Sequence, residues 1–189
     1  MFEQVFEINN ISIIEYLSLE DPSEYDIFLK SIIAENKLCG KICQTNKITF
    51  DEVEVLKKTF NAPGPEDLKD IFILLYGIRG DMKRSDSEEF YSESIFQLFR
   101  VINYFKKWLK EIDKKEREWL SNESNDVLTM LDAGKRLIPF NHLLTKIDVA
   151  ERFSKTPDEI GIWTYGRVFT IIVAIKVRSD IQKEFNEIN

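Results

Sequence analysis

Few side chains in this sequence have the chemistry of a catalytic or metal site. Among 189 residues there is one histidine, His142, and there are two cysteines, Cys39 and Cys43. A tetrahedral zinc site needs four ligands, and two thiols with one distant imidazole cannot supply them within the chain. A histidine-dependent triad would depend on His142 alone. We therefore expect the two thiols to be a buried pair of small apolar groups, on one face of a helix.

Catalytic sequence motifs are also missing. Gly-x-Ser-x-Gly, His-Glu-x-x-His and Cys-x-x-Cys do not occur, and GIRGD lacks the spacing and the following Lys-Ser/Thr of a phosphate loop. The carboxylate pairs Glu88–Glu89 and Asp67–Asp70 fall in predicted first turns of helices, where the helix dipole explains them. We therefore expect no enzymatic activity, no metal and no cofactor. A site assembled from residues distant in the sequence is the alternative that stays open.

The composition predicts an all-α protein, a multi-helix bundle. Hydrophobic residues make up 43% of the chain, but there are only seven glycines and five prolines, which favours long helices with short connections. The net charge of −7 argues against general binding of nucleic acid or anionic membranes. The longest apolar run, at 168–175, is too short to span a bilayer. We expect no secretory signal, since the first residues lack a basic region followed by an apolar one, and the few cysteines suit a reducing compartment.

One long central helix is predicted from about residue 87 to residue 120. Its apolar residues recur every three or four positions, and its lysines alternate with acids, which is typical of a solvated helix face laced with ion pairs. This helix belongs to an N-terminal helical body, 1–134, in which 1–9 form an extended arm or a first helical turn. A further helix is expected at 122–134. Residues 135–189 form a C-terminal helical module, unless the whole chain is one continuous domain.

Local capping signals predict where several helices of the body begin. Asn10 is expected to cap a short helix, and Asp21, followed by proline, a second helix that continues to Asn36. Thr49 and Glu52 form a capping box, in which each side chain accepts a hydrogen bond from the other residue's amide. The helix that this box opens carries its apolar residues at helical spacing, namely Phe50, Val53, Leu56 and Phe60.

The C-terminal module carries the clearest local signals of the chain. Asn141 or Thr145 is expected to cap a helix, and Thr156-Pro157-Asp158-Glu159 combines a capping threonine, a first-position proline and a capping-box glutamate. From Tyr165 onward the pattern is apolar nearly all round as far as Val177, which predicts a helix buried in a core or in an interface, and polar residues continue this helix without a break to Phe185. Its β-branched residues make a central strand the alternative.

Residues 148–163 allow an interpretation as a helix-turn-helix, hence as a DNA-binding regulator. The second helix of such a motif contacts bases and phosphates near its N-terminus. Here that end would present Asp158 and Glu159, whose charges repel phosphate. We therefore favour a module that packs against protein, and expect no sequence-specific binding to nucleic acid.

A resemblance supports this choice. The pattern F-x-x-(S/T)-P-x-E-(I/V), followed by tryptophan and an aromatic residue that lead into an apolar helix, resembles small late-gene proteins of tailed bacteriophages, including tail assembly chaperones and helical connector components. The residues that carry it are Phe153, Thr156, Pro157, Glu159, Ile160, Trp163 and Tyr165. The resemblance covers about fifty residues and leaves the N-terminal body unmatched.

The resemblance implies a non-enzymatic structural protein of the phage particle, such as a head–tail connector, adaptor or ring component. Such a protein is made in the host cytoplasm, ends in the virion, and binds other phage structural proteins and copies of itself. A tail assembly chaperone that is absent from the mature particle is the alternative, beside the DNA-binding regulator. The expected partner-binding residues are Phe153, Pro157, Ile160, Trp163, Tyr165 and Phe169.

Overall fold

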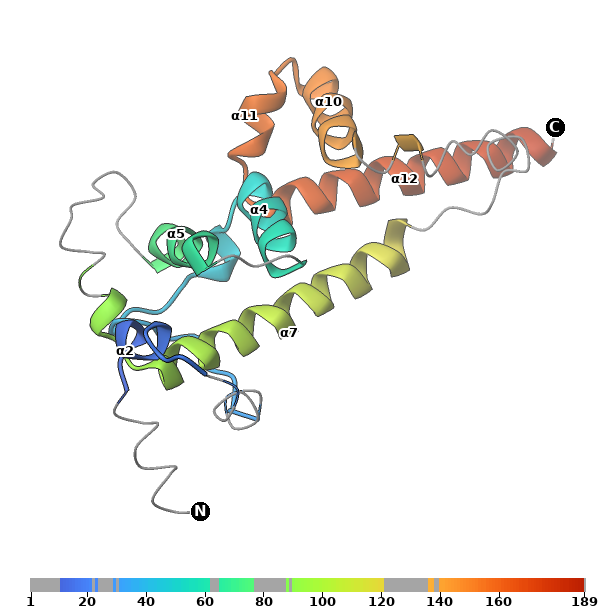
Figure 1. The fold of residues 1–189 in the computed structure, drawn as a ribbon. Helices are drawn as coiled ribbons and strands as arrows, with labels where there is room; N and C mark the ends of the chain where they lie inside the picture. Colours follow the sequence, from blue (N-terminus) through green and yellow to red (C-terminus); the bar gives the residue numbers. More distant parts are fainter. Residues whose placement is uncertain are drawn as a thin grey trace. The chain divides into compact units, whose positions relative to one another are not determined.

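The protein is all-α, as predicted. The computed structural model describes residues 11–21, 23, 29, 31–61, 65–76, 88, 90–120, 136–137 and 140–188, and no strand occurs among them. In order, the helices are α2 (Ile13–Leu17), the 3₁₀ helix η1 (Thr45–Lys47), α4 (Phe50–Asn61), α5 (Pro65–Tyr76), α7 (Ile95–Leu120), α10 (Asn141–Phe153), α11 (Pro157–Gly161) and α12 (Tyr165–Ile188) (Figure 1). None of these helices is both long and apolar enough to cross a membrane.

The contacts divide the chain into two compact units. The N-terminal unit consists of 1–44 and 57–111, and the C-terminal unit of 45–56 and 112–189. The expected boundary after residue 134, the arm at 1–9 and the helix at 122–134 all lie outside the described residues. The new information is that residues 45–56, from the first third of the sequence, group with the C-terminal module.

The core of the N-terminal unit is built on aromatic rings from α5 and α7. The ring of Phe105 lies 6.2 Å from those of Phe72 and Tyr76, and all three residues are buried. The Tyr76 hydroxyl donates a hydrogen bond of 2.6 Å to Asn36, whose side chain also exchanges two hydrogen bonds with the backbone of Cys43. Burial raises the pKa of Tyr76 well above its usual range, so this hydroxyl stays protonated as a donor.

The long helix α7 begins at Ile95, not near residue 87 as expected. Helical residues precede it up to 92, but the backbone departs from the helix at Glu93 and Ser94. There Ile13 donates to the carbonyl of Glu93 and Ile95 donates to the carbonyl of Ile11, so Ser94 pairs with the segment before α2. These long-range hydrogen bonds use backbone groups that a continuous helix needs for itself.

The capping residue of α2 also differs from the expected one. Ser12 caps this helix: its hydroxyl accepts from the amide of Glu15, and the Glu15 carboxylate accepts from the amide of Ser12 at 2.8 Å. Asn10, the expected cap, lies outside the described residues. In a Ser-x-x-Glu capping box each side chain accepts a hydrogen bond from the backbone amide of the other residue, so two amides are satisfied. Asn10, two positions before Ser12, has no such glutamate three residues later.

Residues 31–44 are not helical, which corrects two expectations. The helix expected to continue to Asn36 has ended by Ser31. Cys39 and Gly40 have φ angles of 47° and 72°, and form a tight turn in which Leu38 and Lys41 exchange backbone hydrogen bonds of 2.9 and 2.8 Å. The two thiols therefore do not share a helix face; that of Cys43 is buried, whereas Cys39 is half-buried.

The C-terminal unit has a small apolar core shared by α4, α10, α11 and α12. Its buried members are Phe50, Val149, Ala150, Ile160 and Val168. The N-cap of α10 is Phe140, without a side-chain hydrogen bond, so neither Asn141 nor Thr145 caps it as expected. By contrast, Thr156 and Glu159 form the predicted capping box.

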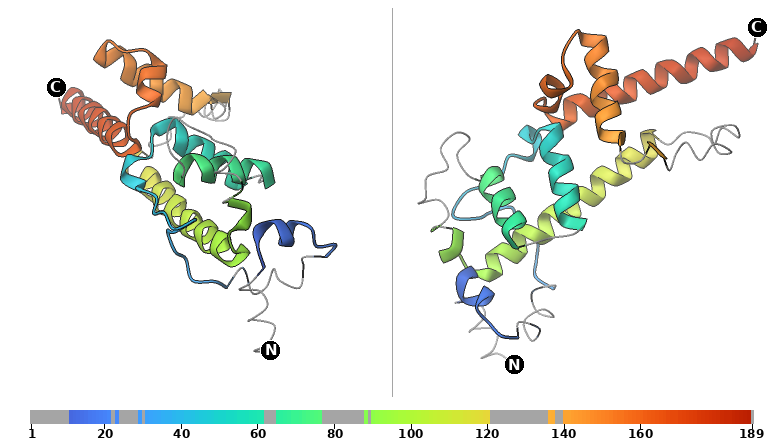
Figure 2. Two further views of the ribbon diagram at one scale, coloured as in Figure 1. Left: turned by 90° about the vertical axis from the view of Figure 1, so that its left-hand side faces the viewer. Right: turned by 45° about the horizontal axis from the view of Figure 1, so that its top comes forward.

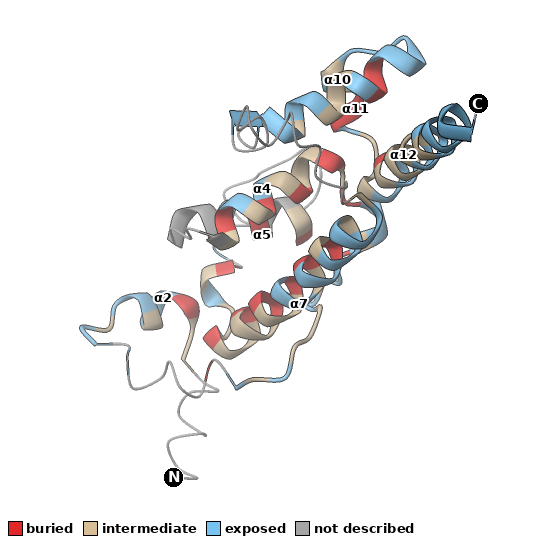
Figure 3. Ribbon diagram, turned by 90° about the vertical axis from the view of Figure 1, so that its right-hand side faces the viewer, coloured by how far each residue is buried: buried red, intermediate tan, exposed pale blue. Residues whose placement is uncertain are grey.

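The predicted C-terminal helix is confirmed as α12, but this chain buries little of it. Val168 is its only fully buried residue among those that the structure describes. The helix extends beyond α10 and α11 (Figure 2), and most of its length is exposed or half-buried (Figure 3). The described part of this chain therefore does not bury α12 on all sides.

Candidate functional site

The joint between α11 and α12 is bound to the start of α4. The amide of Phe50 donates to the carbonyl of Trp163, and the amide of Tyr165 donates to the carbonyl of Ile48, each at 2.9 Å. Between these bonds Thr49 lies opposite Thr164 in an antiparallel pairing. The joint that the sequence marks with two aromatic residues is thus held by main-chain bonds to a segment more than a hundred positions earlier.

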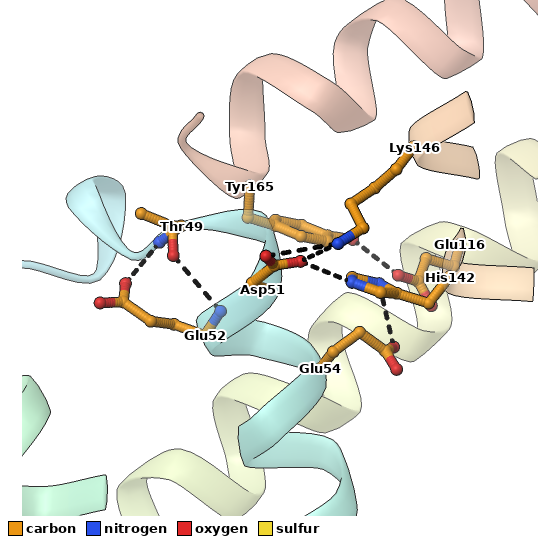
Figure 4. Close-up of polar contacts among 8 residues, drawn as sticks. All are labelled: Thr49, Asp51, Glu52, Glu54, Glu116, His142, Lys146 and Tyr165. Carbon is orange, nitrogen blue, oxygen red and sulfur yellow. Dashed lines mark hydrogen bonds and ion pairs between the residues drawn. The ribbon is translucent and has the colours of Figure 1, made fainter. Parts of the chain in front are cut away.

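Phe50 and Tyr165, which follow the paired threonines in the sequence, belong to a row of stacked aromatic rings. The ring of Phe50 stacks on His142 at 4.6 Å and lies parallel to Tyr165 at 6.3 Å, and Tyr165 stacks on Phe169 at 5.8 Å. The Tyr165 hydroxyl donates to the carboxylate of Glu116 on α7 at 3.0 Å (Figure 4). Burial, and then the negative charge of Glu116, raise the pKa of Tyr165 above its usual range, so the hydroxyl stays a donor.

A charged cluster lies beside the rings, with Asp51 at its centre (Figure 4). Its carboxylate is 2.7 Å from His142 Nε2 and 3.0 Å from Lys146 Nζ. His142 and Lys146 are four positions apart on α10, which puts them on one face of that helix. The capping box, in which Thr49 donates to Glu52 at 2.7 Å, sets the first turn of α4 and so the position of Asp51. The cluster connects α4 to α10.

The charge on Asp51 is stabilised by its neighbours. Partial burial alone would raise the pKa of this carboxyl, but the hydrogen bonds and positive charges of His142 and Lys146 outweigh it and lower the pKa. Gly161, at the end of α11, closes the cluster on a third side: a Cβ at this position would lie 2.0 Å from Asp51 Oδ2. The carboxylate therefore occupies space that any other residue at 161 would fill.

The geometry of the cluster is that of a structural clamp. An aspartate paired with a histidine also orients the imidazole in catalytic triads, where the second ring nitrogen meets a nucleophile. Here Nδ1 of His142 is buried without a hydrogen-bond partner and faces the carboxylate of Glu54 at 3.9 Å. Among the described residues, no three metal-ligating side chains come together. The contacts thus support a role in holding α10 on α4.

A pH-dependent effect on stability follows from the lowered pKa of Asp51. We expect Asp51→Asn to destabilise the C-terminal unit by about 1–2 kcal/mol at pH 7, since it weakens two charge-assisted contacts on a side chain that is 44% exposed. A carboxyl with a lowered folded pKa adds stability above its unfolded pKa, near 3.9, and loses it as the pH falls through the lower folded value. The difference between variant and wild type should therefore shrink below about pH 4.

Urea unfolding at several pH values would measure this difference. Asp148→Asn is the matched control, because Asp148 is an exposed acid of α10 outside the cluster; we expect it to change stability by less than about 0.5 kcal/mol. A difference for Asp51→Asn that stays constant from pH 7 to pH 3 would show that the charge of Asp51 contributes nothing.

The six residues predicted to bind a partner do not form one surface. Ile160 is fully buried in the core, and its side chain is not accessible to another protein. Tyr165 and Phe169 are half-buried and stacked on each other. Pro157 is the first residue of α11 and half-buried. Phe153 is exposed, and Trp163 is half-buried and packs against the core.

Phe153, Trp163 and Arg167 contact one another through their side chains, and together with the exposed Ile162 next to Trp163 in the sequence we call them the aromatic surface. The two rings meet edge to face at 5.5 Å, and the Arg167 guanidinium lies over the Trp163 ring at 3.5 Å. Phe153 is 45% exposed and Ile162 is 72% exposed. Ile162 and Arg167 were not among the residues predicted to bind a partner. Their closeness to Trp163 in the sequence, one position before it and four after it, was the available signal.

No protein-family model, curated protein or solved structure matches this chain.

Proposed function

We propose that this protein is a non-enzymatic assembly protein that binds another protein subunit through the aromatic surface. From the resemblance of its C-terminal module we further infer a structural component of a tailed bacteriophage particle, such as a head–tail connector, adaptor or ring component. The observation that carries the proposal is the exposure of Ile162 and Phe153 beside a tryptophan already held by an arginine.

The chemistry of the aromatic surface suits a protein partner. Tryptophan and arginine are enriched among the residues that dominate binding energy at protein interfaces, and exposed aliphatic groups add area that association removes from water. The Arg167 contact fixes the Trp163 ring before binding, so less side-chain entropy is lost when a partner docks.

The shape and charge of α11 support a protein partner over duplex DNA. The helix has five residues, barely more than one turn, and its first turn carries Asp158 and Glu159. A recognition helix that enters the major groove needs a longer face and no acids at the end that meets phosphates. A tail assembly chaperone would use the same aromatic surface, but would leave before the particle matures.

Incorporation into purified particles tests the proposal. Quantitative mass spectrometry should find the wild-type chain in the particle at a constant copy number. We expect Ile162→Asp to lower its incorporation about ten-fold or more, the effect of losing about 1.4 kcal/mol of binding energy. The matched control is Val55→Asp, at an exposed apolar position on α4, which should change incorporation less than about two-fold.

Two results would overturn the proposal. A wild-type chain that is absent from particles would favour the chaperone. Salt-dependent binding to duplex DNA, unaffected by Ile162→Asp, would favour the regulator, because counterion release is the mark of phosphate contacts.

A further inference from the structure

A second exposed apolar surface runs along the outer half of α12. Five residues lie on one face at spacings of three and four, and we call them the α12 stripe: Ala174, Val177, Ile181, Phe185 and Ile188. All five are exposed, Ile181 to 60% and Ile188 to 84%. Away from the stripe this half of the helix is polar, with a Lys176–Asp180 ion pair at 2.8 Å and a hydrogen bond between Gln182 and Asn186. The outer half of α12 is thus amphipathic, and its apolar side faces solvent.

We propose that a second copy of this chain covers the α12 stripe, through antiparallel pairing of two α12 helices about Ile181. This surface does not include the aromatic surface, so the inference stands or falls independently of the proposed function. A homodimer of this kind would carry two copies of the aromatic surface into an assembly.

The order of side-chain sizes along the stripe favours an antiparallel copy. The residues grow from alanine at one end to phenylalanine and isoleucine at the other. In an antiparallel pair centred on Ile181, Ala174 lies opposite the partner's Ile188 and Val177 opposite the partner's Phe185, so that a small residue faces a large one on both sides of the central isoleucine pair. A parallel pair in register would instead leave a gap between two alanines. Such self-complementarity is what a two-fold interface requires.

Charges beside the stripe predict how salt affects the pair. Asp180 and Glu184 lie on one flank, and the antiparallel arrangement brings Asp180 of one copy near Glu184 of the other. Lys176 partly neutralises Asp180 within its own helix. The remaining repulsion is screened by salt, so the dimer should tighten as ionic strength rises, which is also the direction expected for apolar contacts.

The length of the stripe sets the strength of the pair. From Ala174 to Ile188 it spans about 21 Å of helix, at about 1.5 Å per residue. A stripe one residue wide offers a few hundred Å² per chain, less than the roughly 800 Å² of a standard interface. We therefore expect a dissociation constant in the range of about 10 to 100 μM, so the dimer forms fully only at high local concentration.

Sedimentation equilibrium of the full chain, from low to several hundred micromolar, tests the proposal. Ile181→Asp should weaken the dimer about ten-fold or more, while circular dichroism stays unchanged because Ile181 is exposed. Ser179→Asp adds the same charge on the opposite, exposed face of α12 and should leave the dimer intact. Glu184→Lys should strengthen the dimer, because it places a cation near the partner's Asp180. Ile162→Asp should leave it unchanged.

Disulfide trapping separates the orientations. When chains carrying Ala174→Cys are mixed with chains carrying Ile188→Cys, the two kinds of chain should cross-link to each other under oxidation, with the linked peptides identified by mass spectrometry. Cross-links that join two chains of the Ala174→Cys variant through position 174 would overturn the antiparallel arrangement. A chain that is monomeric at every concentration, or a dimer that Ile181→Asp does not weaken, would overturn the proposal as a whole.

Discussion

Replacing Gly161 with alanine should destabilise the C-terminal unit by about 2–3 kcal/mol, although alanine is the better helix former. A Cβ at this position would lie 2.0 Å from Asp51 Oδ2 and 2.6 Å from Asp51 Cγ, distances that no real contact permits. Asp51 would have to turn away, and His142 and Lys146 would then lose the carboxylate between them. The loss combines two charge-assisted hydrogen bonds with half-buried charges left unpaired.

The physical cause can be isolated with a double-mutant cycle. In an Asp51→Ala background the clash is gone, so Gly161→Ala should cost nothing and is expected to stabilise the unit by about 0.5 kcal/mol through helix propensity. Gly166→Ala is the matched control, since a Cβ there meets nothing within 4 Å. Urea unfolding of the four variants gives the coupling energy. Equal effects of Gly161→Ala in both backgrounds would show that the alanine does not act through Asp51.

Two helix starts were predicted correctly from their capping boxes. The capping boxes at Thr49–Glu52 and Thr156–Glu159 were expected and are present, with hydrogen bonds between residues three apart. Such signals are readable because all the atoms involved lie within one helical turn. The same logic, applied to Ser12 and Glu15, would have found the cap of α2.

The errors in the fold share a long-range cause. The helix expected from residue 87 is interrupted because Ser94 pairs with the segment before α2, more than eighty positions earlier. The turn at Cys39 and Gly40 has left-handed backbone conformations, and nothing in the periodicity of the neighbouring apolar residues reveals it. Backbone hydrogen bonds to distant segments override local helix preference, and a single sequence does not show those partners.

The contacts of the charged cluster could not be predicted from the sequence for a similar reason. Asp51 and His142 are 91 positions apart, and each has an ordinary local role, one in the first turn of α4 and the other at the start of α10. His142 was considered only as a metal ligand or a catalytic base. The visible clue was its spacing of four from Lys146, which puts two potential cations on one helix face and predicts an acidic partner without identifying it.

The apolar residues of the C-terminal module show a different limit. Ile160 and Ile162 are the same residue type two positions apart, yet the first is fully buried and the second is 72% exposed. Apolar character predicts that a side chain leaves water, but it does not distinguish a core from an interface. Ile160 was grouped with the partner-binding residues on that character alone, whereas α11 turns it onto Val149 and Val168 in the core.

The second large effect that we expect is a loss of stability when Ile160, but not Ile162, is replaced by alanine. Ile160→Ala should destabilise the C-terminal unit by about 3 kcal/mol, because it removes buried methyl groups from a small core and leaves a cavity. Ile162→Ala should change stability by less than about 0.5 kcal/mol, since its side chain is already in water. The same substitution at these two positions thus compares a buried isoleucine with an exposed one.

Trp163 offers the readout, because it packs against this core. In a background with Trp108 and Trp119 replaced by phenylalanine, urea unfolding followed by fluorescence reports the unit that contains Trp163. If Ile160→Ala cost as little as Ile162→Ala, Ile160 would not be core, and the original assignment of Ile160 to a partner surface would regain support. We expect Ile160→Ala to destabilise the isolated chain, and Ile162→Ala to lower particle incorporation without unfolding it. Ile160 would then serve folding and Ile162 would serve binding, as their exposures predict.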